Sequence, residues 1–170
     1  LTIHLSLGSV KLFVSTIFNS GDVLVEKNAH TKLNPASLTK LMTSYVAGQE
    51  MKRGNISADD QVRISENAWA KKFPDSSKMF IEVNTDVAMM DLYRGLIIQS
   101  GNDASVAMAE YAGGTEDGFV DLMNAYAGSI GLRNTLFQNS TGLPDPNHFT
   151  STADLAKLTT SFIKKFPDHY

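Results

Sequence analysis

The first pattern in the chain is a β-rich apolar run from residue 11 to residue 18. The turn residues Asn19-Ser20-Gly21-Asp22 follow it, and a second apolar run covers residues 23–25. Two such runs around a turn predict a β-hairpin. Both faces of the first run are largely apolar, so we expect it to lie inside a sheet that is covered on each side. Such a sheet needs more than two strands.

Beyond Pro35 the apolar positions follow helical spacing instead. Those of segment 38–45 recur every three or four residues, and Gly54 ends this run of good helix formers. The last helical pattern begins with the capping-type pair Ser151 and Asp154. The further helices are predicted over residues 86–98, 102–111, 115–130 and 151–166.

Residues 139–150 contain Gly142 and two prolines and indicate an ordered irregular loop. Only the amino-terminal segment is strongly β, so strands come first and no later strands follow to complete the sheet. We therefore predict an α+β fold in a single but incomplete domain. Its sheet strands lie in residues 1–30, and residues 31–170 are mostly helical.

Composition narrows the class of protein. The 170 residues are 42% hydrophobic and 19% charged, which suits one ordinary domain, and no apolar run approaches the ~18 residues of a membrane-spanning helix. The formal charge is -3 and the basic residues are scattered, so nucleic acid is not an expected partner. The absence of cysteine excludes a thiol nucleophile. The chain begins with Leu1 and lacks a signal-peptide pattern, so we expect a mature or trimmed form.

A candidate for chemistry is the segment Ser37-Leu38-Thr39-Lys40 at the start of the first helix. Three residues of spacing place the hydroxyl and the amine on one helix face within mutual reach. The amine lies beside an apolar stripe, and desolvation lowers the pKa of a lysine, so Lys40 can serve as the base that accepts the Ser37 proton. An arbitrary match to this pattern is more often a helix cap followed by a solvated lysine.

A second candidate is the turn Ser100-Gly101-Asn102 between two apolar helices. The Asn102 amide offers both a donor and an acceptor, so it can orient the lysine and a substrate peptide group together. The alternative is a helix–helix turn in which asparagine caps the next helix.

Other candidate motifs are weaker. Ser161-Phe162-Ile163-Lys164 repeats the spacing inside the last helix, away from a helix start, and we interpret that pair as surface. The four histidines show no metal-ligand spacing, so we expect no metal site. A Ser-His-Asp triad is not excluded by spacing, but the chain has no G-x-S-x-G segment to support one.

Taken together, the segments around Ser37-x-x-Lys40 and Ser100-Gly101-Asn102 resemble the low-molecular-mass penicillin-binding proteins, specifically the D-alanyl-D-alanine carboxypeptidases. The resemblance covers about residues 12 to 166. It continues through Gly21-Asp-Val-Leu-Val-Glu-Lys-Asn28, Ala68-Trp69, Asp117-Gly-Phe119, Leu122-Met-Asn124, Gly131-Leu132, Gly142-Leu143 and Phe149-Thr-Ser-Thr-Ala-Asp154.

The resemblance implies a β-lactamase/transpeptidase-like fold and a serine acyl-transfer enzyme of the bacterial periplasm or of the outer face of the cytoplasmic membrane. Its substrate would be a peptidoglycan stem peptide ending in D-Ala-D-Ala, and β-lactams would acylate the same serine. Ser37 would be the nucleophile and Lys40 its general base. Ser100 would relay protons to the leaving group, and Asn102 would hold Lys40 and the substrate amide. No cofactor is implied.

The chain departs from the family pattern in two places. Residues 1–11 do not resemble the usual mature start, and no K-T-G, K-S-G or H-T-G occurs anywhere. In the family that third motif lies on a later strand. It supplies a cation for the substrate carboxylate there and flanks an N–H group of the oxyanion hole. We therefore expect the carboxy-terminal sheet strands, and any membrane-anchoring tail, to be missing from this chain. We also expect the 170 residues alone to be poorly active, because one lost oxyanion donor typically costs about 10²- to 10³-fold in rate.

Two alternatives remain open on the sequence. A serine β-lactamase needs a base for rapid deacylation, and residues 139–148 contain no glutamate, although Asp145 is available. A non-catalytic peptidoglycan-binding paralogue is the other.

Overall fold

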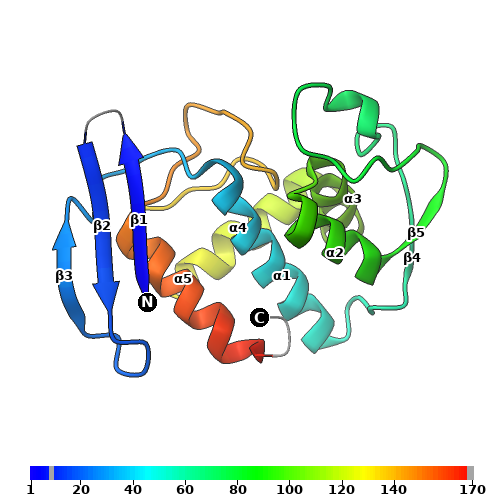
Figure 1. Cartoon of the computed structure of the whole chain (residues 1–170). Helices are drawn as coiled ribbons and strands as arrows, with labels where there is room; N and C mark the ends of the chain where they lie inside the picture. The colour runs from blue at the N-terminus through cyan, green and yellow to red at the C-terminus, as the bar shows by residue number, and fades with distance from the viewer. Residues whose placement is uncertain (8–9, 168–170) are drawn as a thin grey trace. The chain divides into compact units, whose positions relative to one another are not determined.

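The computed structural model describes residues 1–7 and 10–167 (Figure 1). The chain divides into two compact units. The first comprises residues 1–35, residues 124–137 and the described chain from residue 144 onward. The second comprises residues 36–123 and 138–143.

The first unit contains a three-stranded antiparallel sheet in the order β1-β2-β3 (Figure 1). Its strands are β1 (Thr2–Leu7), β2 (Val10–Thr16) and β3 (Val23–Lys27). The β2–β3 pair confirms the predicted hairpin, and β1 is the additional strand that this hairpin required.

Helix α5 (Thr152–Lys165) contacts β1 and β2 and covers one face of this sheet. Leu12, Val14 and Thr16 are buried, whereas Phe13 and Ser15, which alternate with them, are only half-buried. The expectation that both faces of β2 are covered is therefore wrong for the described chain.

The second unit begins with a 3₁₀ turn, η1 (Ala36–Leu38), that leads into α1 (Thr39–Arg53). Gly54 ends α1 as predicted: it adopts a left-handed conformation with φ 78°, and its N–H donates to the last turn of the helix. Glycine is favoured there because it reaches positive φ without steric cost.

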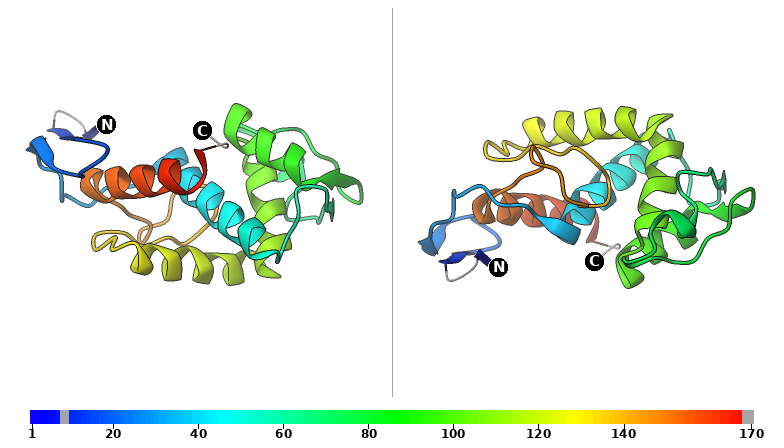
Figure 2. Two further views of the ribbon diagram at one scale, coloured as in Figure 1. Left: turned by 90° about the horizontal axis from the view of Figure 1, so that it is seen from below. Right: turned by 90° about the horizontal axis from the view of Figure 1, so that it is seen from above.

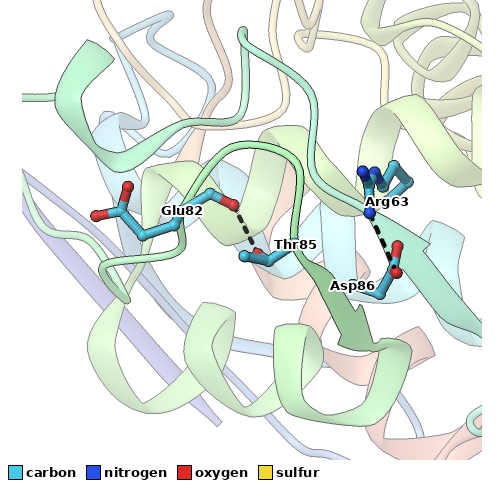
Figure 3. A network of polar contacts seen from close by, with 4 residues as sticks. All are labelled: Arg63, Glu82, Thr85 and Asp86. Carbon is cyan, nitrogen blue, oxygen red and sulfur yellow. Dashed lines mark hydrogen bonds and ion pairs between the residues drawn. The ribbon is translucent and has the colours of Figure 1, made fainter.

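One predicted helix begins too early. Residues 86–88 form strand β5 (Asp86–Ala88), which pairs with β4 (Gln61–Arg63), and α2 starts only afterwards (Met89–Gln99). Figure 3 shows the contacts around this pair: Arg63 and Asp86 form an ion pair at 3.2 Å, and the Thr85 hydroxyl donates to the Glu82 carbonyl at 2.6 Å. Pairing with a distant strand overrides the local helical pattern.

The other predicted helices are confirmed as α3 (Asn102–Gly113), α4 (Glu116–Ser129) and α5. A short 3₁₀ helix, η2 (Ala70–Lys72), lies in the long loop between β4 and β5. Within the second unit, α1, α2 and α3 contact one another pairwise and enclose an apolar core; Figure 2 gives two further views of them. Among residues 1–7 and 10–167, no helix combines the length and hydropathy that a membrane crossing requires.

Candidate active site

Ser37 lies in η1, immediately before α1, and its side chain is exposed. Lys40 follows in the first turn of α1, but only 6% of its surface is exposed. The residue before the helix, Leu38, makes no side-chain capping bond. The interpretation of this motif as a serine cap followed by a solvated lysine is wrong for the lysine, because the amine is buried and makes its hydrogen bonds inside the protein.

The Lys40 amine has two hydrogen-bond partners in the described chain. Its Nζ donates to Asn102 Oδ1 at 2.7 Å and to the Thr141 carbonyl at 2.7 Å. A neutral amine has two N–H groups and one lone pair, so these two acceptors use both protons and leave the lone pair free to accept another. The arrangement therefore suits a base.

Burial lowers the pKa of Lys40 from 10.5 to about 8. Burial acts in this direction because it removes water from the charged form of the amine. Roughly a fifth of the amines are then neutral near pH 7.4, against about one in a thousand for a solvated lysine. The side chain can therefore accept a proton close to physiological pH.

Asn102 is the first residue of α3 and is 5% exposed. Its Oδ1 accepts from Lys40 while its Nδ2 donates to the Ser76 hydroxyl at 2.9 Å. The Asn102 N–H donates to the Ser77 carbonyl at 2.8 Å. These partners fix the orientation of the amide and join α1, α3 and the loop that carries the two serines.

Ser100 closes α2 in a left-handed conformation with φ 53°, which is uncommon for a residue with a side chain. The turn is tied back by the Gly101 N–H, which donates to the Gly95 carbonyl at 3.1 Å. Ser100 is half-buried and is not among the residues that line the cavity at Ser37. Its predicted role as a proton relay therefore rests on the family resemblance.

A cavity of about 570 Å³ opens beside Ser37 within the second unit. Its wall carries the hydroxyls of three serines and the carboxylate of Asp75. The lining residues are Ala36, Ser37, Pro74, Asp75, Ser76, Ser77, Asn102, Thr141, Gly142 and Leu143. Asp75 is the one ionisable side chain among them, so this wall offers no cation to a substrate carboxylate.

Gly142 allows the loop of Thr141 to lie against the start of α1. Its φ is 86°, and a Cβ there would lie 1.8 Å from the Ala36 carbonyl oxygen. Any other residue would push this loop away from the helix that carries Ser37 and Lys40. The sequence identified Gly142 as a loop residue but gave no sign that the neighbouring carbonyl reaches Lys40.

The remaining sequence candidates lie elsewhere. Lys164 of the second serine–lysine pair is exposed, as predicted, and its Nζ donates to the Asn19 carbonyl at 3.1 Å. In the part of the chain that the structure describes, no group of three or more histidine and acidic side chains could hold a metal ion.

Comparison with known sequences gives a consistent answer. The family model described as D-alanyl-D-alanine carboxypeptidase matches residues 10–170. The chain is 46% identical over 162 residues to D-alanyl-D-alanine carboxypeptidase DacA of Haemophilus influenzae, covering 95% of this chain and 41% of that protein. It is 40% identical over 146 residues to DacF of Bacillus subtilis, covering 86% and 37%.

Solved structures agree with the sequences. Penicillin-binding protein 5 of Haemophilus influenzae has a TM-score of 0.92 at 46% identity, over 94% of this chain and 46% of that one. Penicillin-binding protein 6B of Escherichia coli has a TM-score of 0.87 at 42% identity, over 91% and 50%. The chain thus spans about two fifths of the length of these sequence relatives.

Proposed function

The chain belongs to the D-alanyl-D-alanine carboxypeptidase family. We propose that it carries the active-site serine of an enzyme that removes the terminal D-alanine from peptidoglycan pentapeptides. Its fold, which contains both helices and small sheets, is that of the penicillin-binding proteins, as the family resemblance implied. The observation that carries the proposal is the buried Lys40 amine, held by Asn102 and the Thr141 carbonyl one helical turn from Ser37.

In the proposed reaction, Ser37 Oγ attacks the carbonyl carbon of the penultimate D-alanine while the Lys40 amine accepts the hydroxyl proton. The tetrahedral intermediate collapses, the peptide bond breaks and the terminal D-alanine leaves as an amine that takes a proton through Ser100. Water then hydrolyses the ester on Ser37 and restores the hydroxyl. Asn102 supports both steps, because its amide holds Lys40 and faces the cavity.

β-Lactams are the proposed inhibitors, because a cyclic amide that imitates D-alanyl-D-alanine would acylate Ser37 in the same way. The substrate lies outside the cytoplasmic membrane, so we propose that the protein acts in the periplasm or on the outer face of that membrane. Labelling of cells by a fluorescent penicillin that does not cross the cytoplasmic membrane, after the outer membrane has been permeabilised, tests the location. Labelling that also requires rupture of the cytoplasmic membrane would contradict it.

The chemistry is tested by intact-mass analysis after exposure to benzylpenicillin. Two proteins are compared: the 170-residue chain, and a chimera that continues it with the remaining sequence of the Haemophilus influenzae relative. We expect an adduct on Ser37 in the chimera and a slower or absent adduct in the chain alone, because the cavity wall supplies no cation. Equal rates would refute the expected weak activity of the chain.

Variants assign the roles. Ser37→Ala and Lys40→Ala should each abolish the adduct, whereas Ser161→Ala, in the second serine–lysine pair, should leave it unchanged. No adduct in either protein, with muropeptide binding retained, would overturn the enzymatic proposal in favour of a peptidoglycan-binding protein. Continuous penicillin turnover would indicate a β-lactamase instead of a carboxypeptidase, for which we expect slow release.

A further inference from the structure

The loop of residues 138–143 supplies the Thr141 carbonyl to Lys40, and Ser140 anchors that loop. The Ser140 carbonyl accepts from the Thr43 hydroxyl of α1 at 2.6 Å and from the Ser105 hydroxyl of α3 at 2.7 Å. Ser140 is fully buried, so each of these bonds is made away from solvent. Loss of the anchor would leave polar groups unpaired in the interior.

The other polar atoms of Ser140 bind one carboxylate. Its N–H donates to Glu116 Oε1 at 3.0 Å, and its hydroxyl donates to the same oxygen at 2.7 Å. Glu116 is the first residue of α4, where the helix dipole favours a negative charge. Glu116 is therefore fixed at the start of α4, and its carboxylate binds the loop through Ser140.

Only one peptide separates this anchor from the site. Ser140 is bonded to Thr141, whose carbonyl accepts from Lys40 Nζ at 2.7 Å. Asn139 Oδ1 adds stiffness within the loop, because it accepts from the Gly142 N–H at 2.7 Å and from the Thr141 hydroxyl at 3.0 Å. A displacement of Ser140 would therefore also displace the Thr141 carbonyl.

We propose that Glu116 is a positioning residue that, through Ser140, holds the Thr141 carbonyl on the Lys40 amine. This inference rests on the proposed function in so far as Lys40 is the base. The carbonyl occupies one N–H of the amine and helps to keep water from it, so its position decides both the direction of the lone pair and the ease of protonation.

Other charged groups surround the site and do not bind the amine. In the described chain the hydrogen-bond partners of Lys40 Nζ are Asn102 and Thr141. The buried Asp103 carboxylate accepts from the Met79 and Ile81 N–H groups, and the Lys78 amine donates to the carbonyls of residues 73 and 74. Besides Lys40, the charged side chains on α1, α3 and α4 are Glu50, Lys52, Arg53, Asp103, Glu110, Glu116, Asp117 and Asp121, and residues 73–78 add Asp75 and Lys78.

Two variants separate the effect of the length of the Glu116 side chain from the effect of its charge. Glu116→Gln removes the charge but keeps an oxygen at the same reach, so it should retain both bonds to Ser140. Glu116→Asp keeps the charge but draws the carboxylate back by one methylene, so it should lose them. The proposal predicts a change in Asp and none in Gln, whereas a direct charge effect on Lys40 predicts the reverse.

The readout is the titration midpoint of the Lys40 side chain, followed by NMR of the Cε carbon in the ¹³C-lysine-labelled chain. The Lys40 signal is assigned by its loss in Lys40→Arg. We expect Glu116→Asp to raise the midpoint by about one pH unit, because a loosened loop admits water to the amine. The rate of Ser37 acylation at pH 7 should then fall about tenfold, with the pH profile displaced by the same amount.

Glu110→Asp is the matched control. Glu110 also holds a serine and an amide, because its carboxylate accepts from the Ser65 hydroxyl at 2.5 Å and from Asn67 Nδ2 at 3.1 Å. That pair does not connect to Lys40, so its loss should lower the melting temperature without moving the Lys40 midpoint.

An unchanged midpoint in a folded Glu116→Asp protein would overturn the inference, whatever the acylation result. If Glu116→Asp fails to fold, Ser140→Ala serves instead, because it removes one of the two bonds to Glu116 and should give a smaller rise in the midpoint. Absence of a Ser37 adduct in the unmodified chimera would refute the proposed function alone, since the NMR titration requires no activity.

Discussion

The buried Lys40 amine should make the stability of the protein depend on pH in a way that Lys40→Met removes. An unfolded lysine binds its proton below pH 10.5, whereas the folded amine binds it only below about pH 8. Between these values the unfolded state holds a proton that the folded state has released. Protonation therefore opposes folding, and the free energy of unfolding rises with pH across this window.

The size of the effect follows from the shift. A lowering from 10.5 to about 8 corresponds to about 3 kcal/mol of destabilisation at pH 7, at ~1.36 kcal/mol per pKa unit. At pH 9 about 2 kcal/mol of it remains, because the folded amine is then mostly neutral. The difference in the free energy of unfolding between Lys40→Met and the unmodified chain should therefore fall by about 1 kcal/mol from pH 7 to pH 9.

Urea unfolding followed by circular dichroism at pH 7, 8 and 9 measures this difference. Other titrating groups cancel between the two proteins, and the hydrogen bonds lost with the amine add a constant that does not change the slope. Lys52→Met, at an exposed position of the same helix, shows whether removal of any lysine gives the same slope. A difference between Lys40→Met and the unmodified chain that is flat or increases with pH would refute the buried base.

Three further predictions concern the frame of the site. Gly142→Ala should lower the free energy of unfolding by about 3 kcal/mol and slow Ser37 acylation, because its Cβ would clash with the Ala36 carbonyl. Gly128→Ala has open space around its Cβ, so it should leave the free energy of unfolding unchanged or raise it by about 0.5 kcal/mol. Asp103→Ala should lower the free energy of unfolding by about 3 kcal/mol, since its buried carboxylate holds two N–H groups of the loop between β4 and β5. Ser151→Ala should cost about 1 kcal/mol by removing the cap of α5; chemical denaturation measures all of these changes.

Local chemistry explains which elements could be predicted. Gly54 and Ser151 mark helix ends through conformational freedom and capping, which operate within a few residues, and both ends are confirmed. Strand β5 was missed because residues 86–88 become a strand only by pairing with residues 61–63, and nothing within the segment itself signals that partner. The hairpin required a further strand, but residues 2–7 could not be identified as that strand from their own pattern, because β1 is defined by its pairing with β2.

The same division runs through the site. Ser37 and Lys40 could be found because one helical turn places them, and Asn102 because its turn follows a recognisable motif. The Thr141 carbonyl could not, because a carbonyl belongs to every residue and this one lies 101 positions from the amine it binds. Its only trace in the sequence is Gly142, which lets the loop approach α1. The proposed base needs two acceptors to direct its lone pair, and sequence reasoning misses the acceptor that the buried backbone supplies.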